Sequence, residues 1–322
     1  MKYSYFILLL LTIFFGCERP TDYNQTDSGI PPAVPSSPAV YAAYDGNILI
    51  YWQNDPEADL KGYNVYRSTD SVNFKFIVFT TDNSYIDDSL NYNTRYYYRI
   101  TALDIWNNQS SPSEIISAVP ANKYAPYAPS GISINARNWE GQESVYLNWN
   151  PNPESDIAGF KIYRSTSPGF KADSGTFIGY TNKLEYTDTL DLKLYTIYYY
   201  ALKAVDKGGL ISYASSEVND EIFGIPQIIF PLDDASTSYF QQFIITAVDK
   251  PAKYEIIVQD NEYFGELWST DFNSSETGDT LYVPFTPNYL YPGTYYWRVA
   301  TYSDNGSGPN SISKLYKFII KQ

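Results

Sequence analysis

The chain has 322 residues, with 22 Lys and Arg, 36 Asp and Glu, and no histidine. Histidine is the commonest general base and a common metal ligand, so its absence argues against triad hydrolases, zinc proteases and haem proteins. The net charge of −14 argues against nucleic-acid binding, because contact with phosphates requires clustered lysine and arginine. The 34 tyrosines, 18 glycines and 20 prolines favour an all-β chain with frequent turns.

The N-terminal segment predicts export from the cytoplasm. Lys2 precedes an apolar stretch from Phe6 to Phe15. This stretch is shorter than the roughly 20 residues that a membrane-spanning helix requires, and it has the charge and length of a signal peptide. We therefore expect residues 1–16 to be removed during export and the Pro-rich residues 17–35 to form a flexible linker.

The single cysteine of the sequence directly follows this segment. Phe14-Phe15-Gly16-Cys17 resembles a bacterial lipobox, in which a cysteine after a small residue is acylated and becomes the new N-terminus. Gly16 and Cys17 match that pattern, whereas Phe14 and Phe15 depart from its usual leucine and small residue. The resemblance implies lipidation at Cys17, with palmitate as a label, and a place in the bacterial cell envelope, at the outer membrane or cell surface. The alternative is an ordinary signal peptide with an incidental cysteine.

A long internal repeat organises the rest of the chain. Residues 52–69 read WQNDPEADLKGYNVYRST, and residues 149–166 read WNPNPESDIAGFKIYRST. Residues 94–104 and 196–206 are also similar, and each contains three consecutive tyrosines. A period near 100 residues is too long for a solenoid repeat and fits tandem domains.

Each copy has the alternation of a half-buried strand. Tyr96, Tyr98, Ile100 and Ala102 fall on one face of a strand, with other residues between them. Turn-forming clusters such as Asn54-Asp55-Pro56 separate the short strands. Short strands with regular turns predict a β-sandwich.

Residues 90–102 read L-x-Y-x-T-x-Y-x-Y-x-I-x-A, and residues 192–204 read L-x-L-x-T-x-Y-x-Y-x-L-x-A. This pattern resembles the tyrosine corner and sixth strand of fibronectin type III domains. The resemblance implies one domain at residues 36–120 and a second at residues 125–222. It also implies a structural core that includes Trp52, Tyr96, Trp149 and Tyr198.

The last hundred residues carry a weaker form of the same pattern. Residues 254–258 alternate as a strand, and residues 290–299 resemble the corner and sixth strand of the first two copies. We expect residues 224–322 to form a divergent fibronectin or immunoglobulin-like domain. The predicted fold is all-β, with three tandem immunoglobulin-like β-sandwiches of the fibronectin type III kind.

A repeated acidic motif raises the question of metal binding. Residues 55–59 read DPEAD, and residues 152–156 read NPESD. The EF-hand calcium loop also requires a glycine at its sixth position and a glutamate at its twelfth, where the first copy has Leu60 and Tyr66. We therefore interpret the motif as a turn between two strands, and we expect no metal and no cofactor.

Aromatic side chains outside the core are the candidates for ligand contact. Those expected to point away from the core face, or to lie in or near loops, are Tyr97, Trp106, Trp139, Tyr199, Tyr263 and Trp268. Exposed rings could contact a glycan or a protein, but outward tyrosines on strands also serve cross-strand packing. We expect no enzyme, because the sequence shows neither a nucleophile motif nor a cleft for paired carboxylates.

The sequence therefore predicts a lipid-anchored envelope protein with a non-catalytic binding, adhesion or spacer role. Its expected partners are the membrane, through the lipid on Cys17, and a protein or polysaccharide at the cell surface. One alternative is a carbohydrate-binding surface lipoprotein of a polysaccharide-capture system. Another is an accessory part of an extracellular enzyme system.

Overall fold

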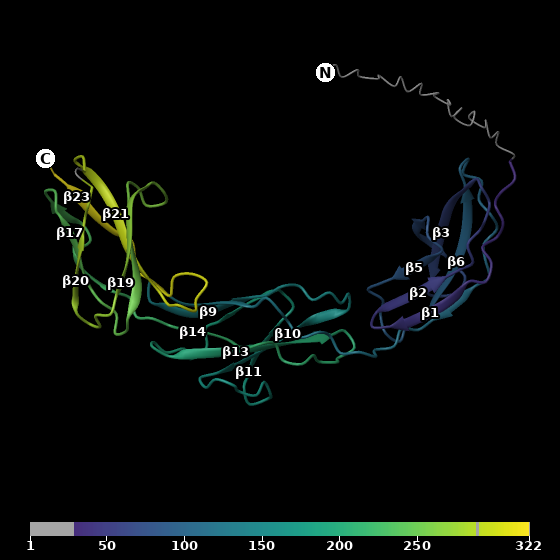
Figure 1. Cartoon of the computed structure of the whole chain (residues 1–322), viewed down its shortest axis with the longest axis horizontal. Coiled ribbons are helices and arrows are strands. Elements are labelled where there is room, and N and C mark those ends of the chain that lie inside the picture. Colours follow the sequence, from purple (N-terminus) through teal and green to yellow (C-terminus); the bar gives the residue numbers. More distant parts are fainter. Residues whose placement is uncertain (1–28, 288–289, 322) are drawn as a thin grey trace, which may run out of the picture. The chain divides into compact units, whose positions relative to one another are not determined.

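The computed structural model describes residues 29–287 and 290–321. Within these residues the regular structure consists of strands β1 to β23 without a helix (Figure 1). The described part of the chain thus offers no helix long and apolar enough to cross a membrane. The prediction of an all-β fold is confirmed, whereas the signal peptide and Cys17 lie outside the described residues.

The first group of strands covers residues 39–118. Its members are β1 (Ala39–Tyr44), β2 (Asn47–Tyr51), β3 (Leu60–Ser68), β4 (Lys75–Thr80), β5 (Ser84–Asp87), β6 (Tyr96–Asp104) and β7 (Ile116–Ala118). One sheet has the order β1-β2-β5 and the other the order β4-β3-β6-β7. Alternate side chains are buried on β2 and along the first half of β6, as expected for strands with one face on a core.

The second group repeats this arrangement. Its strands are β8 (Ser133–Trp139), β9 (Gln142–Asn148), β10 (Ile157–Ser165), β11 (Phe177–Thr181), β12 (Glu185–Asp188), β13 (Ile197–Asp206) and β14 (Val218–Glu221). The order β11-β10-β13-β14 corresponds to β4-β3-β6-β7 of the first group. Trp149 packs edge to face with Phe160, with ring centres 5.1 Å apart, and Trp52 packs in the same way with Tyr63, with ring centres 5.2 Å apart. The repeated tryptophan thus makes the same aromatic contact in both sandwiches.

The third group forms the predicted third sandwich. Its strands are β15 (Gln227–Phe230), β16 (Ala235–Thr237), β17 (Gln242–Thr246), β18 (Ala252–Gln259), β19 (Glu266–Ser274), β20 (Thr280–Pro284), β21 (Gly293–Tyr302), β22 (Ser311–Ile312) and β23 (Tyr316–Ile320). The order β15-β17-β20 makes one sheet, and β18, β19, β21 and β23 belong to the other. Fully buried aromatic side chains dominate its core, namely Phe243, Tyr254, Trp297 and Phe318.

The three sandwiches share a serine turn, which follows β6, β13 and β21. In each sandwich a serine hydroxyl accepts a hydrogen bond from a backbone N–H of that strand. The pairs are Ser113 with Ile100 at 3.0 Å, Ser215 with Leu202 at 3.0 Å, and Ser313 with Val299 at 3.1 Å. The hydroxyl thus supplies an acceptor for a backbone N–H of the strand.

The second and third sandwiches share one continuous sheet. The short strand β22 pairs with β21 of its own sandwich and, in parallel, with β8 of the second sandwich. A nine-stranded sheet results, which includes β12-β9-β8-β22-β21-β18-β19. Residues from Ala118 onward accordingly belong to one compact unit, and most of the first group belongs to another.

The expectation of a flexible linker through residue 35 is wrong for its described part. Pro32 and Pro35 are buried, and the N–H of Ala33 donates to Glu57 Oε1 at 3.0 Å. Apolar prolines and an available glutamate hold this segment on the first sandwich. Residues 32–35 are thus attached to the first sandwich, whereas residues 17–28 lie outside the described residues.

The glutamate of the acidic motif has the same task in both copies. Glu57 accepts the N–H of Ala33, and Glu154 accepts the N–H of Tyr127 in the segment that precedes β8. The motif lies between β2 and β3 and again between β9 and β10, where the turns were predicted. Within the described residues, no three His, Cys, Asp or Glu side chains are grouped to hold a metal ion.

Candidate functional site

The two tryptophans and two tyrosines expected in the core are buried. The exposed fraction is 1% for Trp52, 6% for Tyr96, 4% for Trp149 and 3% for Tyr198. The hydroxyl of Tyr198 accepts a hydrogen bond from the backbone N–H of Lys193 at 2.8 Å. This bond fixes the corner before β13, as in the tyrosine corner of related sandwiches.

The six candidate aromatic residues do not form one site. Tyr97 and Trp106 are in the first sandwich, Trp139 and Tyr199 in the second, and Tyr263 and Trp268 in the third. Tyr97, Trp106, Tyr199 and Trp268 are half-buried, whereas Trp139 is 38% and Tyr263 is 86% exposed. Of the six, Tyr263 therefore offers the most surface for a ligand.

Trp139 is engaged where the second sandwich meets the third. Its indole N–H donates to the carbonyl of Pro309 at 3.1 Å, just before β22. The guanidinium of Arg137 lies 4.5 Å from the ring centre, within the range of a cation–π contact. These contacts give Trp139 a role in the junction between the two sandwiches.

Trp268, expected in or near a loop, is the third residue of β19. It stacks on the buried Phe243, with ring centres 5.7 Å apart. Its ring also packs edge to face with Phe285, with ring centres 5.0 Å apart, and its indole N–H donates to Thr286 Oγ1 at 3.1 Å. The polar composition of β19, ELWSTDFNS, hid this edge strand from a search for apolar alternation. Trp268 is part of the core wall.

Exposed aromatic side chains gather in loops at one end of the third sandwich. The pairing of Gln242 with Pro284 and of Thr237 with Ile320 places the loops after β16 and β20 at the same end. The pairing of Gln259 with Tyr296 places the loop after β18 there too. The side chains and their exposed fractions are Tyr239 39%, Tyr263 86%, Phe264 71% and Tyr291 74%. We call these four residues the aromatic loop surface.

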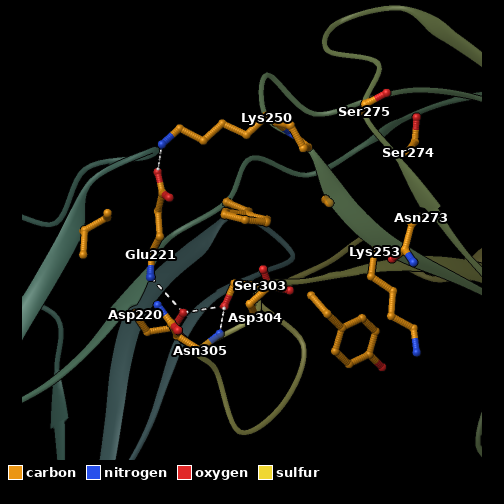
Figure 2. Close-up of a pocket in the computed structure, with 15 residues that line it drawn as sticks. Asp220, Glu221, Lys250, Lys253, Asn273, Ser274, Ser275, Ser303, Asp304 and Asn305 are labelled. Carbon is orange, nitrogen blue, oxygen red and sulfur yellow. Dashed lines mark hydrogen bonds and ion pairs between the residues drawn. The ribbon is translucent and has the colours of Figure 1, made fainter.

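A polar groove opens at the junction of the second and third sandwiches (Figure 2). Its volume is about 460 Å³, and its walls come from β14, β18, β19 and the ends of the neighbouring loops. Figure 2 shows Asp220 and Glu221 on one side and Asn273, Ser274 and Ser275 on the other. We call this space the junction groove.

Asp220 is a buried residue in the lining of the junction groove, with an exposed fraction of 1%. Its carboxylate accepts five hydrogen bonds, from Ala136 N, Glu221 N, Ser303 Oγ and, twice, Asn310 Nδ2, at 2.7 to 3.0 Å. Ala136 belongs to the second sandwich, whereas Ser303 and Asn310 belong to the third. Burial raises the pKa of Asp220, and these hydrogen bonds offset part of that effect. One carboxylate thereby ties the two sandwiches together.

The remaining charges of the groove are largely paired. Lys250 forms an ion pair with Glu221, and Lys253 Nζ lies 2.9 Å from Asp271. Burial, together with the hydrogen bond that the hydroxyl donates to Glu255, raises the pKa of Tyr302 to about 12. At neutral pH the phenol is therefore an uncharged wall of the groove.

Arg164 lies outside the groove and is also engaged. Its Nη1 contacts Asp188 Oδ2 at 2.6 Å, and the hydroxyl of Tyr200 donates to the same oxygen at 2.8 Å. Burial raises the pKa of Tyr200, and the charge of Asp188 adds to this effect. The arginine therefore serves a buried ion pair.

No protein-family model matches the chain. Over 199 residues the chain is 29% identical to "Exoglucanase B" of Cellulomonas fimi, a match that covers 58% of this chain and 17% of that protein. Over 98 residues it is 31% identical to an exo beta-1,2-glucooligosaccharide sophorohydrolase (non-reducing end) of Parabacteroides distasonis, covering 28% of this chain and 14% of that protein. The chain thus spans less than a fifth of either relative. Among solved structures, the FN1–FN3 domains of chicken CNTN1 align with 91% of this chain at 14% identity and a TM-score of 0.37.

Proposed function

We propose that this chain is a lipid-anchored protein of the bacterial cell envelope with a non-catalytic binding, adhesion or spacer role. The observation that carries the proposal is the continuous sheet through β8 and β22. This sheet joins the second and third sandwiches end to end. A contact surface on the third sandwich is therefore held at a fixed position relative to the second. That is the property required of a module that presents a binding surface.

Two features of the junction groove support a non-catalytic role. Hydrolysis of a glycosidic bond usually needs a pair of carboxyl groups, one of which donates a proton to the leaving group. Asp220 is saturated with hydrogen bonds and Glu221 is paired with Lys250. Turnover of any substrate in a panel of glycans would contradict this part of the proposal.

The lipid anchor on Cys17 is supported by the sequence. The apolar stretch, Gly16 and the single cysteine stand in the order that lipidation requires. A myristoyl-length chain alone binds membranes weakly, so stable anchoring needs more than one acyl chain. The test is metabolic labelling with palmitate in cells that express the wild type or Cys17→Ser. We expect the label and membrane retention to be lost in the variant, and undiminished labelling would reject the anchor.

A second candidate function is carbohydrate binding in a polysaccharide-capture or enzyme-associated system. The two relatives named for glucan hydrolysis favour it, since the chain matches parts of both. The aromatic loop surface supplies exposed rings of the kind that pack against the C–H groups of sugars. The partner itself can be sought by pull-down of the mature protein from its own envelope.

The structure selects the variants for this second candidate. Trp268→Ala would remove part of the core, so the full chain with Tyr263→Ala and Phe264→Ala is the better probe. Tyr213, 91% exposed on the second sandwich, gives the matched control Tyr213→Ala. In affinity electrophoresis through β-glucans, retardation that is lost in the double variant and kept in the control would support carbohydrate binding. Retardation equal in all three proteins would exclude the aromatic loop surface as the binding site.

A further inference from the structure

We infer that the junction groove binds a neutral, polyhydroxylated ligand about the size of a disaccharide. The inference rests on the second candidate function and gives it a second contact site, apart from the aromatic loop surface. The groove lies between two sandwiches, a frequent position for ligand sites, and its volume of about 460 Å³ is within the range of small-ligand pockets.

The lining of the groove combines an apolar floor with a polar rim. Phe223 and Ala252 are buried beneath the opening. Asn273 and Ser275 are exposed on one side, and Asp304 is exposed on the loop that follows β21. A sugar matches both parts of this lining, because its C–H groups pack on apolar surface and its hydroxyls need hydrogen-bond donors and acceptors.

Several of these polar groups are free to bind. No hydrogen bond within the described part of the chain engages the side chains of Asn273, Ser275 or Asp304. The amide of Asn273 can donate and accept, the hydroxyl of Ser275 can do the same, and the carboxylate of Asp304 can accept from a hydroxyl. Together they can bind a ligand whose hydroxyls act both as donors and as acceptors.

The charges of the groove favour a neutral ligand over an ionic one. Its lining carries Asp220, Glu221 and Asp304 against Lys250 and Lys253, and Asp271 compensates Lys253. A phosphate or carboxylate would face unpaired acidic charge, because both ammonium groups are already held by carboxylates. A cation would find only Asp304, since Asp220 and Glu221 are engaged. A neutral polar ligand avoids both costs.

The Asp220 network makes the groove a preformed site. Its two sides come from different sandwiches, and their separation is fixed by hydrogen bonds from Ala136, Ser303 and Asn310 to one carboxylate. A ligand that enters therefore does not pay for ordering the walls. Rigid walls also make the fit selective for ligand size.

The test is isothermal titration of the full chain with glucose disaccharides of β-1,2 and β-1,4 linkage. We expect saturable binding of at least one of them, with a dissociation constant on the order of 1 mM, as a few hydrogen bonds in an open groove allow. Asn273→Ala should weaken this binding about tenfold, the effect of one lost hydrogen bond. Asn182→Ala, an exposed asparagine in the turn between β11 and β12, is the matched control and should leave it unchanged.

A second variant tests the groove without removing a hydrogen-bonding group that the fold uses. Ser275→Trp would fill the opening from an exposed turn, and we expect it to abolish binding. Affinity that is unchanged in both Asn273→Ala and Ser275→Trp would overturn the inference, as would tighter binding of glucuronic acid than of glucose disaccharides. If no disaccharide binds but β-glucan retardation persists through Tyr263 and Phe264, the groove inference fails alone. If neither binds, the carbohydrate candidate fails with it.

Discussion

The replacement Asp220→Ala tests whether one carboxylate joins the second and third sandwiches. The variant removes the acceptor of five hydrogen bonds. The alanine side chain is smaller and causes no clash, so the expected loss of stability comes from the donors that are left without an acceptor. Asp304→Ala is the matched control, because Asp304 lies in the loop that carries the donors Ser303 and Asn310 but is itself exposed.

The magnitude follows from the donors one by one. The N–H of Ala136, in a residue that is 0% exposed, would have no acceptor, and an orphaned buried donor costs about 1 to 3 kcal/mol. The N–H of Glu221 would lose its acceptor as well, whereas the Asn310 amide keeps the carbonyl of Glu221 at 2.9 Å. Relief of the buried charge of Asp220 offsets part of this cost. We expect a net loss of about 2 to 4 kcal/mol.

Hydrogen exchange combined with urea denaturation measures both the size and the place of this effect. With a denaturant slope of about 2 kcal/mol per molar urea, a loss of 3 kcal/mol lowers the midpoint by about 1.5 M. Exchange should quicken in the β8 segment around Ala136 and in the loop before β22, but not in Asp304→Ala. Unchanged protection of β8 in Asp220→Ala would refute the reasoning, even if the midpoint moved.

Three further predictions concern the fold. Arg164→Met leaves the buried charge of Asp188 without its partner at 2.6 Å and should cost about 3 to 5 kcal/mol in a denaturant titration; a change below 1 kcal/mol would contradict the ion pair. Trp149→Ala should cost about 3 to 5 kcal/mol, while the conservative Trp149→Phe should recover much of that loss by the same assay. The N–H and side-chain amide of Asn73 hold the pKa of Asp70 well below its usual range, so Asp70→Ala should lower stability at pH 7. Because a depressed pKa stabilises only above the unfolded value, that difference should narrow as the pH falls below about 4, and a constant difference down to pH 2 would disprove it.

The repeated part of the fold could be predicted because it is local. The alternation through Tyr96, Tyr98 and Ile100 sets which side chains face the core, and a period of two residues specifies a strand wherever it occurs. The strong repeat then supplied the second sandwich from the first. The third sandwich kept the corner and the sixth strand but not the tryptophan before the third strand, so its assignment depended on fewer residues.

The parts that could not be predicted depend on contacts between distant segments. The strand β22 has two residues, too few for any periodicity, and it exists because β8 lies beside it. Asp220 follows no motif, and its importance comes from Ala136 and Asn310, which are 84 and 90 residues away in sequence. The role of Glu57 was hidden for the same reason, since its partner Ala33 precedes the repeat.

The shared sheet also decides how the candidate sites have to be tested. A fragment that begins at residue 224 would expose the edge of β22 that β8 covers. It would also lack Asp220, the acceptor of the hydrogen bond from Ser303. Exposed strand edges promote non-native pairing, so loss of binding in such a fragment would not separate a missing site from a damaged sandwich. In the full chain, by contrast, the aromatic loop surface and the junction groove are at opposite ends of the same strands, because Gln259 of β18 ends near the first and Ala252 lines the second. Variants at one end therefore leave the other intact, and each site can serve as the internal control of the other.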